Sequence, residues 1–218
     1  MKKGKLIIVE GPDFCGKSTQ LDFLKNNEVS SKLIFTREPG SYLPKSKEEC
    51  EKLRALVLNN KYSLEDEAAI FARSRYIHTK EIIELLEQGH NVISDRYIVS
   101  SLAYQGYAQS LGAQKVLDIN KATLELLDDA GITIECIKFT IEEKEWRERK
   151  AKRLKQESAD VIEEKDICES ILDFFTDENI FYACTHKLNM NVYEVDATGS
   201  VYEVYNQLIS TIETILED

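Results

Sequence analysis

The stretch Gly11–Ser18 has the spacing of a loop that binds nucleotide phosphates. It reads G-x-x-x-x-G-K-S, follows the apolar run 5–10 and precedes a segment with helical character. Glycines at these positions permit a close backbone approach, so that successive N–H groups point toward a phosphate. Lys17 adds positive charge; the alternative is a glycine-containing turn with an incidental lysine. The residues expected to hold the nucleotide are Gly11, Pro12, Asp13, Phe14, Cys15, Gly16, Lys17, Ser18 and Thr19.

A second polar group follows the apolar run 91–95. Asp95 closes this run and Arg96 comes directly after it, at the carboxyl edge where α/β proteins bind ligands. We expect the Ser18 hydroxyl to ligate a magnesium ion and the Asp95 carboxylate to hold a magnesium-bound water. A structural ion pair is the common alternative for neighbouring Asp and Arg. The chain has no N-K-x-D sequence for reading guanine, which disfavours a GTPase.

Five short apolar runs rich in β-branched residues are predicted to be the strands that position these groups. They occupy residues 5–10, 32–37, 91–95, 132–141 and 191–196. Longer segments of helical period, such as 64–88, separate them, and this alternation predicts one α/β domain with a parallel sheet covered on both faces. Helix starts are expected at Ser46, Ser63 and Ser200, each three residues before an acidic residue, and a helix stop at Gly89.

The composition is that of a soluble globular protein. The 218 residues include 28 Lys and Arg against 39 Asp and Glu, a net charge of −11 that disfavours broad binding to nucleic acid or to an anionic membrane. The 5 cysteines form no C-x-x-C pair, which is typical of reduced thiols. Because no signal sequence or membrane span is recognisable, we expect a cytoplasmic protein.

Four motifs occur in the order and at the spacing of one enzyme family. They are "EGPDFCGKSTQ", "FTREPG", "FARSR" and "SDRYIVSSLAYQG". On these motifs the chain resembles the thymidylate kinase family, strongly over residues 5–108 and weakly beyond. The resemblance implies a P-loop NTPase fold, three-layer α/β/α, with a five-stranded parallel sheet and a mobile lid at about 147–163. It also implies ATP as phosphate donor, Mg²⁺, phosphorylation of dTMP to dTDP, and a homodimer.

The resemblance also implies which residues bind dTMP. Planar guanidinium groups suit the acceptor phosphate. In the family the ring at Phe71 stacks on thymine, and plain core packing is the alternative from the residues alone. Tyr104 stands where the family excludes a ribose 2′-hydroxyl, or else is a helix residue filling the core. The full set is Arg37, Glu38, Arg54, Phe71, Arg75, Arg96, Ser100, Ser101, Tyr104 and Gln105.

One departure from the family concerns the catalytic positive charge. Some members place an arginine directly after the loop aspartate, where this chain has Phe14. We therefore expect arginines of the charged segment 147–165 to close over ATP, although a solvated helix face is the alternative. Arg147, Arg149 and Arg153 are the candidates, and which of them engages is open. The catalytic residues expected are Asp13, Lys17, Arg96, Arg149 and Arg153.

Two other functions remain open at this point. One is a related P-loop kinase for another nucleotide or for a deoxynucleoside. Without an acceptor phosphate, however, Arg37, Arg54 and Arg96 would crowd unneutralised charge together. The other is a catalytically impaired nucleotide-binding regulator, which the intact Lys17 and Arg96 disfavour.

Overall fold

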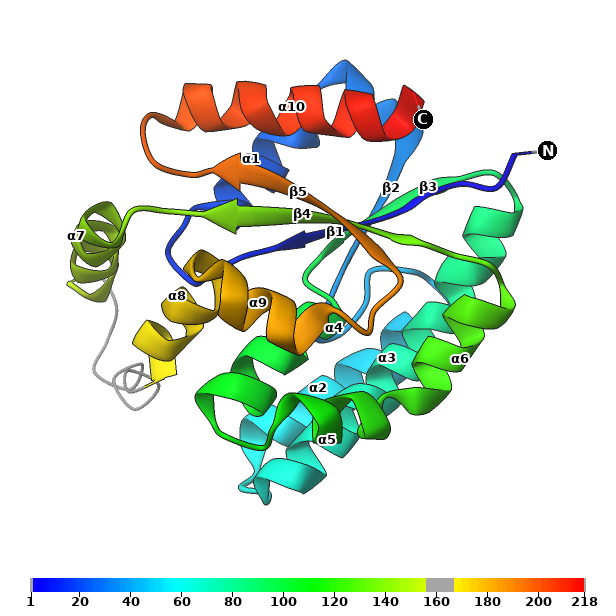
Figure 1. The fold of residues 1–218 in the computed structure, drawn as a ribbon. Coiled ribbons are helices and arrows are strands. Elements are labelled where there is room, and N and C mark those ends of the chain that lie inside the picture. The colour runs from blue at the N-terminus through cyan, green and yellow to red at the C-terminus, as the bar shows by residue number, and fades with distance from the viewer. Residues whose placement is uncertain (1, 156–166, 218) are drawn as a thin grey trace.

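A single parallel sheet of five strands forms the centre of the protein (Figure 1). The computed structural model describes residues 2–155 and 167–217. The strands are β1 (Leu6–Glu10), β2 (Leu33–Arg37), β3 (Asn91–Asp95), β4 (Ile134–Thr140) and β5 (Met190–Asp196). All five strand predictions are confirmed, with ends within two residues of those expected.

The strand order brings the functional loops to one edge of the sheet. The order is β2-β3-β1-β4-β5, so the chain runs to one side of β1 first and to the other side later. Val9 lies opposite Asp95, and Asp95 lies opposite Arg37. The carboxyl ends of β1, β2 and β3 are therefore adjacent, and the chain reverses its strand order beside β1. Open α/β sheets bind ligands at this kind of switch point.

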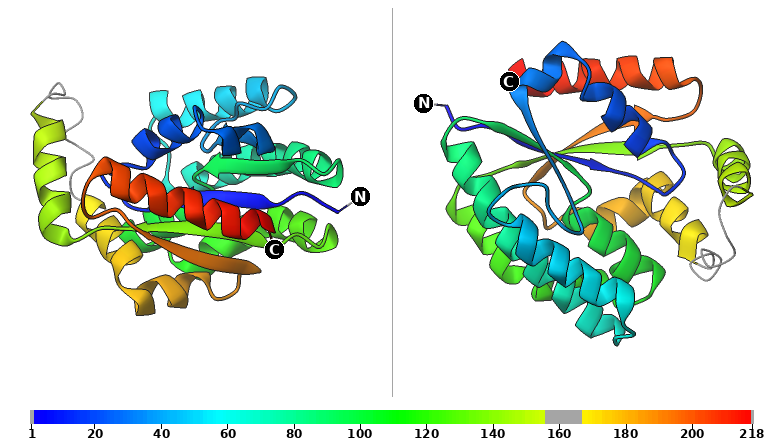
Figure 2. Two further views of the ribbon diagram at one scale, coloured as in Figure 1. Left: turned by 90° about the horizontal axis from the view of Figure 1, so that it is seen from above. Right: turned by 180° about the vertical axis from the view of Figure 1, so that it is seen from behind.

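Helices cover both faces of the sheet (Figures 1 and 2). Leu6 and Ile8 of β1 belong to the hydrophobic core on one face, and Ile7 and Val9 to the core on the other. This is the period-2 alternation of a strand buried on both sides. The three-layer α/β/α architecture is therefore confirmed.

The two helical layers differ in size. One contains α1 (Lys17–Leu24), the short 3₁₀ helix η1 (Glu28–Lys32) and α10 (Val201–Glu217). The other contains α2 (Lys47–Asn59), α3 (Leu64–Glu87), α4 (Ile98–Ser101), the π-helical η2 (Leu102–Ala108), α5 (Ala113–Ile119), α6 (Lys121–Asp129), α8 (Cys168–Thr176) and α9 (Glu178–Thr185). The other helix of the described residues, α7 (Glu143–Leu154), stands beyond the carboxyl ends of the strands (Figure 1).

Three of the four predicted helix ends are confirmed. The Ser63 hydroxyl accepts from the backbone N–H of Asp66 at 3.1 Å, and the Ser200 hydroxyl accepts from the N–H of Glu203 at 3.3 Å. Gly89 follows α3 with a φ of 86°, a left-handed angle that favours glycine.

The capping role predicted for Ser46 is wrong. Ser46 precedes α2, but its backbone is already helical and its side chain caps no N–H group. Its hydroxyl lies 2.8 Å from that of Ser41 instead, and its own N–H donates to Glu81 at 2.7 Å. The buried Glu81 carboxylate of α3 therefore binds the backbone at the start of α2, and no local side chain caps this helix.

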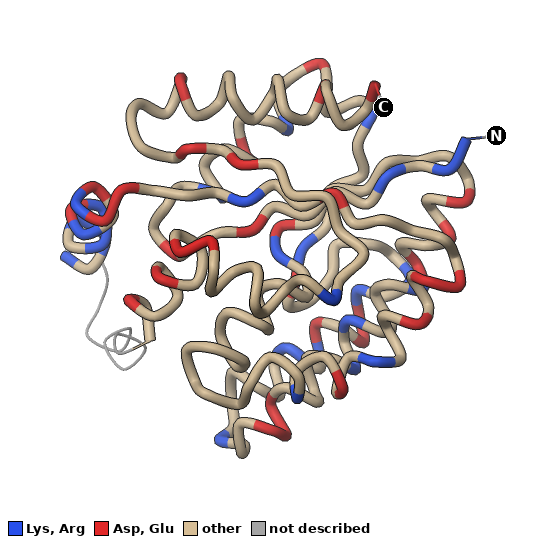
Figure 3. The backbone as a smooth tube through the Cα atoms, viewed as in Figure 1, with Lys and Arg blue, Asp and Glu red and all other residues tan. Residues whose placement is uncertain are grey.

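The described part of the charged segment 147–165 is helical up to Leu154. Residues 147–154 belong to α7, which carries both Glu and Lys or Arg side chains, as α2 and α3 carry charges of both signs (Figure 3). Residues 156–163 of the predicted lid lie outside the described residues. Within the described part of the chain, no helix is long and apolar enough to cross a membrane.

Candidate active site

The loop between β1 and α1 has the backbone that its glycines predict. Gly11 has a φ of 150° and Gly16 one of 98°. A Cβ atom at Gly11 would lie 2.8 Å from the Cβ of Phe139, so any larger residue would displace β4 or the loop. The Lys17 ammonium group donates to the carbonyl oxygens of Gly11 at 2.8 Å and Pro12 at 2.7 Å. The loop thus wraps around the lysine at the start of α1.

Helix α7 holds the middle of this loop. The Trp146 indole, which is fully buried, donates from Nε1 to the carbonyl oxygen of Asp13 at 2.7 Å. The Phe14 ring lies edge-on to the Trp146 ring, with centroids 6.3 Å apart. One helical turn further on, Arg149 donates to the carbonyl oxygen of Cys15 at 2.9 Å. Contacts to three successive loop residues therefore fix the direction of the peptide groups between them.

Residues that follow β3 contact the phosphate loop at Asp13. Arg96 has a left-handed φ of 68°, which costs a non-glycine residue roughly 1–3 kcal/mol. Its guanidinium group donates to Asp13 Oδ1 at 2.5 Å and to the Ser100 hydroxyl at 3.2 Å. Tyr104 donates its hydroxyl to the other oxygen of Asp13, also at 2.5 Å. The Asp13 carboxylate therefore joins the phosphate loop to this second loop.

Glu10, at the end of β1, binds the loop that follows β3. Its fully buried carboxylate accepts from the backbone N–H of Tyr97 at 2.7 Å and of Ser100 at 3.1 Å. It also accepts from the Ser100 hydroxyl at 2.7 Å. The bond to Tyr97 satisfies an N–H group at the N-cap of α4, and the Ser100 N–H is shared between Glu10 and the Tyr97 carbonyl oxygen at 3.2 Å. They also fix the backbone directly after Arg96.

Charge and burial oppose each other in this cluster. Burial favours protonation of Asp13, but the positive charges of Arg96 and Lys17 outweigh it and lower the pKa of the carboxyl group. For Glu10 burial dominates and raises the pKa above its ordinary value of 4.5, although Arg96 opposes this. The pKa of the Arg96 guanidinium, despite its burial, is raised by Tyr104, Asp13 and other acidic groups. Arg96 is therefore charged throughout the physiological range.

Two cavities meet at this cluster, and we name them donor and acceptor after the roles expected from the sequence. The donor cavity, of about 630 Å³, is lined by Asp13, Phe14, Cys15, Gly16, Lys17, Ser18, Thr19, Gln20, Asp95, Arg96, Arg149, Lys150, Lys152, Arg153, Leu154, Cys168, Val201 and Val204. The acceptor cavity, of about 460 Å³, is lined by Asp13, Glu38, Pro39, Val57, Leu58, Glu67, Phe71, Ser74, Arg75, Arg96, Tyr97, Ser100, Ser101, Tyr104, Gln105, Gln109, Ile167, Cys168 and Ile171. Asp13, Arg96 and Cys168 line both, so a molecule in each cavity would meet its neighbour at Asp13 and Arg96.

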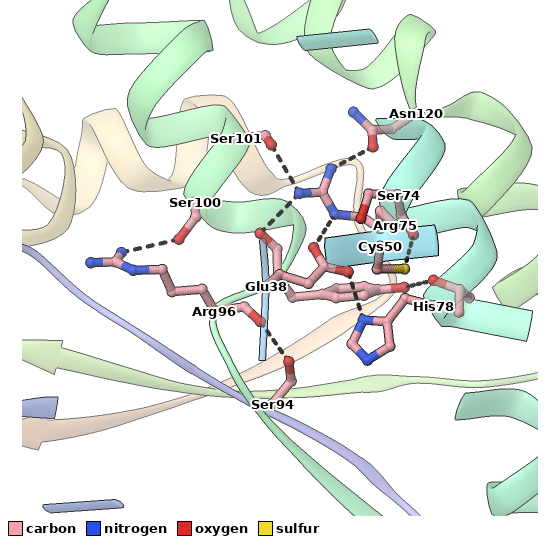
Figure 4. Close-up of polar contacts among 12 residues, drawn as sticks. Glu38, Cys50, Ser74, Arg75, His78, Ser94, Arg96, Ser100, Ser101 and Asn120 are labelled. Carbon is pink, nitrogen blue, oxygen red and sulfur yellow. Dashed lines mark hydrogen bonds and ion pairs between the residues drawn. The ribbon is translucent and has the colours of Figure 1, made fainter. Parts of the chain in front are cut away.

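Arg75 lies in the wall of the acceptor cavity, and hydrogen bonds to neighbouring side chains fix its guanidinium group. Its three nitrogen atoms donate to Glu38 at 2.7 Å, to Asn120 at 2.6 Å and to the Ser101 hydroxyl at 3.0 Å (Figure 4). The buried His78 ring lies 3.0 Å from the second oxygen of Glu38. Phe71, one turn before Arg75 on α3, also lines the cavity and is half-buried. The predicted shared face of these two residues is therefore present.

Most of the predicted site residues line these two cavities, but Gly11, Pro12 and three arginines are absent from their described walls. Arg37 and Arg54 pair with Glu51 at 2.9 Å and 3.7 Å, and neither is in the described wall of the acceptor cavity. Arg147 pairs with Glu143 and with Glu169 on the exposed side of α7 and is absent from the described wall of the donor cavity. Arg149 and Arg153 do line the donor cavity.

Many residues of the site were not predicted from the sequence, and four of them stand out by their contacts. They are Glu10, Glu67, Asn120 and Trp146, each of which contacts a predicted site residue. A carboxylate at the end of an apolar strand and the only tryptophan of the chain are unusual enough to have drawn attention to Glu10 and Trp146. The sequence carries no comparable signal for Asn120.

The predicted magnesium ligands lie in the donor cavity. Ser18 and Asp95 both line it, one at the start of α1 and one at the end of β3. A hydroxyl and a carboxylate are oxygen donors of the kind that Mg²⁺ prefers, so these residues fit the ion. The described residues contain no group of three or more His, Cys, Asp or Glu side chains arranged to hold a metal by themselves.

The fold and the loop define a P-loop nucleotide-binding protein, and comparison with known proteins gives its family. The family model "Thymidylate kinase" matches residues 9–208. The chain is 39% identical over 166 residues to the thymidylate kinase of Thermoanaerobacter sp. (strain X514), covering 72% of this chain and 78% of that protein. It is 30% identical to that of Geobacillus sp. (strain WCH70), covering 99% of both. The chain therefore belongs to the thymidylate kinase family.

A solved structure has the same fold. The crystal structure of thymidylate kinase from Ehrlichia chaffeensis superposes with a TM-score of 0.61 and covers 96% of this chain and 99% of its own. The sequence identity between the two is 22%, so this comparison supports the fold only.

The lowered pKa of Asp13 predicts how the protein responds to acid. Asp13→Asn should lower the free energy of unfolding at pH 7 by about 1 kcal/mol or less, because Asp13 is partly exposed and screened by solvent. The ionised carboxylate stabilises the fold above its ordinary pKa of 3.8, and this contribution is lost as the pH falls further. Urea denaturation of both proteins between neutral and acidic pH should show their difference shrinking toward zero below that value. A constant difference would contradict the assignment.

Proposed function

We propose that this protein transfers the γ-phosphate of ATP to dTMP, producing ADP and dTDP. One observation carries the proposal beyond family membership: Asp13 and Arg96 line both cavities. A donor on the phosphate loop and an acceptor beside Phe71 and Arg75 would bring their phosphates together at these two side chains.

Phosphoryl transfer depends mainly on the positioning of the two substrates and on positive charge around the transferring group. A phosphate oxygen of dTMP attacks the γ-phosphorus, a P–O bond forms, and the bond to the ADP oxygen breaks. Arg96 and Lys17 offset negative charge on the transferring group. Asp13 holds Arg96 in place, and no carboxylate need remove a proton because a phosphate monoester is already an adequate nucleophile at neutral pH.

The base and sugar of dTMP fit the rest of the acceptor cavity in this proposal. Phe71 would stack on thymine, Gln105 and Arg75 would face its polar edge, and Tyr104 would lie against the deoxyribose. Ser100, Ser101 and Glu38 complete this set through their contacts with Arg96 and Arg75.

Arg37 and Arg54 are proposed as further ligands of the acceptor phosphate. Support comes from their Nε–H groups, which are buried and have no hydrogen-bond partner among the described residues. A buried donor without a partner costs about 1–3 kcal/mol, so an anion nearby would be stabilised. Their contacts with Glu51 would then be exchanged in part for contacts with phosphate.

Mg²⁺ would be held by Ser18 and, through water, by Asp95. Its charge would offset that of the β- and γ-phosphates when bound. Ser18, the first residue after Lys17 in α1, would offer a neutral oxygen, and Asp95 a negative one.

Arg149 and Arg153 have different proposed roles at the donor cavity. Arg149 donates to the carbonyl oxygens of Cys15, Ala197 and Gly199, so it would shape the phosphate loop. Arg153, one turn further along α7 in the wall of the same cavity, would approach the phosphates of ATP.

The protein is further proposed to be a cytoplasmic homodimer that acts as one kinase domain over residues 1–218, with dTMP as its small-molecule partner. One exposed apolar side chain that lines neither described cavity wall supports the dimer: Leu56, near the end of α2, is 43% exposed. Scattered exposed leucines are common, so the test is the molar mass in solution.

A substrate panel tests the proposed reaction. With ATP and Mg²⁺, a coupled ADP-release assay should show that dTMP has the highest kcat/KM among dTMP, dUMP, UMP, dCMP and thymidine. Thymidine should react poorly because it lacks the phosphate that the arginines bind. Absence of turnover with dTMP, or a preference for thymidine, would refute the proposal.

Replacing Arg96 tests the shared position of the two cavities. Arg96→Ala should lower kcat by about 10²-fold or more, as expected for the loss of one preorganised charge, while changing ATP affinity little. Lys152→Ala is a control that removes a cation from the wall of the donor cavity alone. If Arg96→Ala instead weakens ATP binding and leaves kcat unchanged, Arg96 acts on the donor and not at the junction.

A further inference from the structure

Glu67 contacts the one side-chain amide proposed to read the base. Gln105 Nε2 donates to Glu67 Oε1 at 2.9 Å, and both residues line the acceptor cavity. Gln105 is 5% exposed, and Glu67 comes from α3, one turn before Phe71. The contact therefore joins η2 to α3 inside the cavity.

The carboxylate fixes which way the amide faces. An ionised carboxylate only accepts hydrogen bonds, so it selects the nitrogen of Gln105 and would repel the amide oxygen. Among the described residues none donates to Gln105 Oε1, and this oxygen is not one of the buried atoms left without a partner. It is therefore accessible, and the cavity that Gln105 lines is where a ligand would reach it.

A fixed amide distinguishes two kinds of pyrimidine edge. Thymine and uracil present an N3–H donor beside the O4 acceptor, which match an amide oxygen and an amide N–H. Cytosine presents an N3 acceptor beside the N4 amino donor and requires the amide turned by 180°. A free glutamine rotates to suit either edge. A glutamine held by Glu67 would have to place its oxygen against the carboxylate in order to accept cytosine.

Arg75, also proposed to face the base, only donates hydrogen bonds, so its preference for a base carbonyl does not depend on Glu67. Arg75 already donates from all three of its nitrogen atoms to Glu38, Asn120, Ser101 and the Tyr97 carbonyl oxygen. Gln105, in contrast, has an acceptor with no partner among the described residues. The amide is therefore the group whose match to the base edge depends on how a neighbouring side chain orients it.

We propose that Glu67 is a specificity-determining residue that orients the Gln105 amide and so excludes cytosine nucleotides from the acceptor cavity. The inference rests on the proposed function, because it takes a pyrimidine monophosphate as the acceptor. Glu67 acts through Gln105 and is a positioning residue. The discrimination concerns the edge shared by thymine and uracil, and leaves the 5-methyl group to other parts of the cavity.

Glu67→Gln removes the acceptor-only character at nearly the same size, because its amide serves either orientation of Gln105. In the full-length protein with ATP, the ratio of kcat/KM for dTMP to that for dCMP should fall by about tenfold or more. The ratio for dTMP to dUMP should stay within about twofold, since both bases offer the same edge. A merely structural role for Glu67 would not separate these two ratios.

Two further variants complete the test. Glu65→Gln removes an equal charge from the same helix, at an exposed ion pair with Lys115, and should leave both ratios unchanged. Glu67→Ala also frees the amide and should lower the dTMP to dCMP ratio. It replaces Glu67→Gln in the test if that variant expresses poorly.

The outcomes separate this inference from the proposed function. A dTMP to dCMP ratio that stays high in both Glu67 variants, or falls together with the dTMP to dUMP ratio, overturns the role of Glu67. A wild-type protein that does not prefer dTMP to dCMP overturns it as well. Absence of any wild-type turnover of dTMP instead refutes the proposed function itself.

Discussion

The contact between Asp13 and Arg96 is the interaction on which the rest of the site depends. It joins two loops that follow neighbouring strands, β1 and β3, and it lies where the donor and acceptor cavities meet. Arg96 reaches Asp13 from a left-handed backbone conformation, which costs free energy that the surrounding contacts must offset. Strain of this kind persists where other interactions fix the backbone, and Glu10 supplies them by binding the N–H groups of Tyr97 and Ser100.

Side chains adjacent to the site bind its loop, its arginine and its amide, and so keep each of them in one orientation. Trp146 and Arg149 bind carbonyl oxygens of the phosphate loop, Glu38 and Asn120 bind the guanidinium group of Arg75, and Glu67 binds the amide of Gln105. Preorganised dipoles and charges of this kind require little rearrangement during a reaction. The middle of the phosphate loop illustrates the point. The Asp13 side chain faces the second loop, while the Asp13 carbonyl oxygen and the Phe14 ring face α7.

Local patterns were sufficient to predict the sheet and the phosphate loop. The strands are short β-branched runs, and the loop needs glycine at positions whose backbone angles or close contacts exclude other residues. The resemblance to the thymidylate kinase family supplied the residues around the acceptor cavity.

The supporting residues could not be predicted in this way, because their partners are remote in sequence. Trp146 binds a residue 133 positions away, and Glu10 binds one 90 positions away. The failed cap at Ser46 has the same origin, since Glu81 from α3 binds its N–H. Arg37 and Arg54 lie outside the described cavity wall because Glu51, one turn of α2 before Arg54, binds them both.

The central claim is that the two cavities hold the two substrates end to end, with their phosphates meeting at Asp13 and Arg96. Calorimetry with one molecule that joins adenosine to thymidine through a polyphosphate chain tests it most directly. The account predicts one molecule bound per chain, displaced by ATP and by dTMP alike. Its affinity should exceed that of either nucleotide by about 10²-fold or more, because the second contact is intramolecular. An affinity no higher than that of ATP, or displacement by only one nucleotide, would contradict the account.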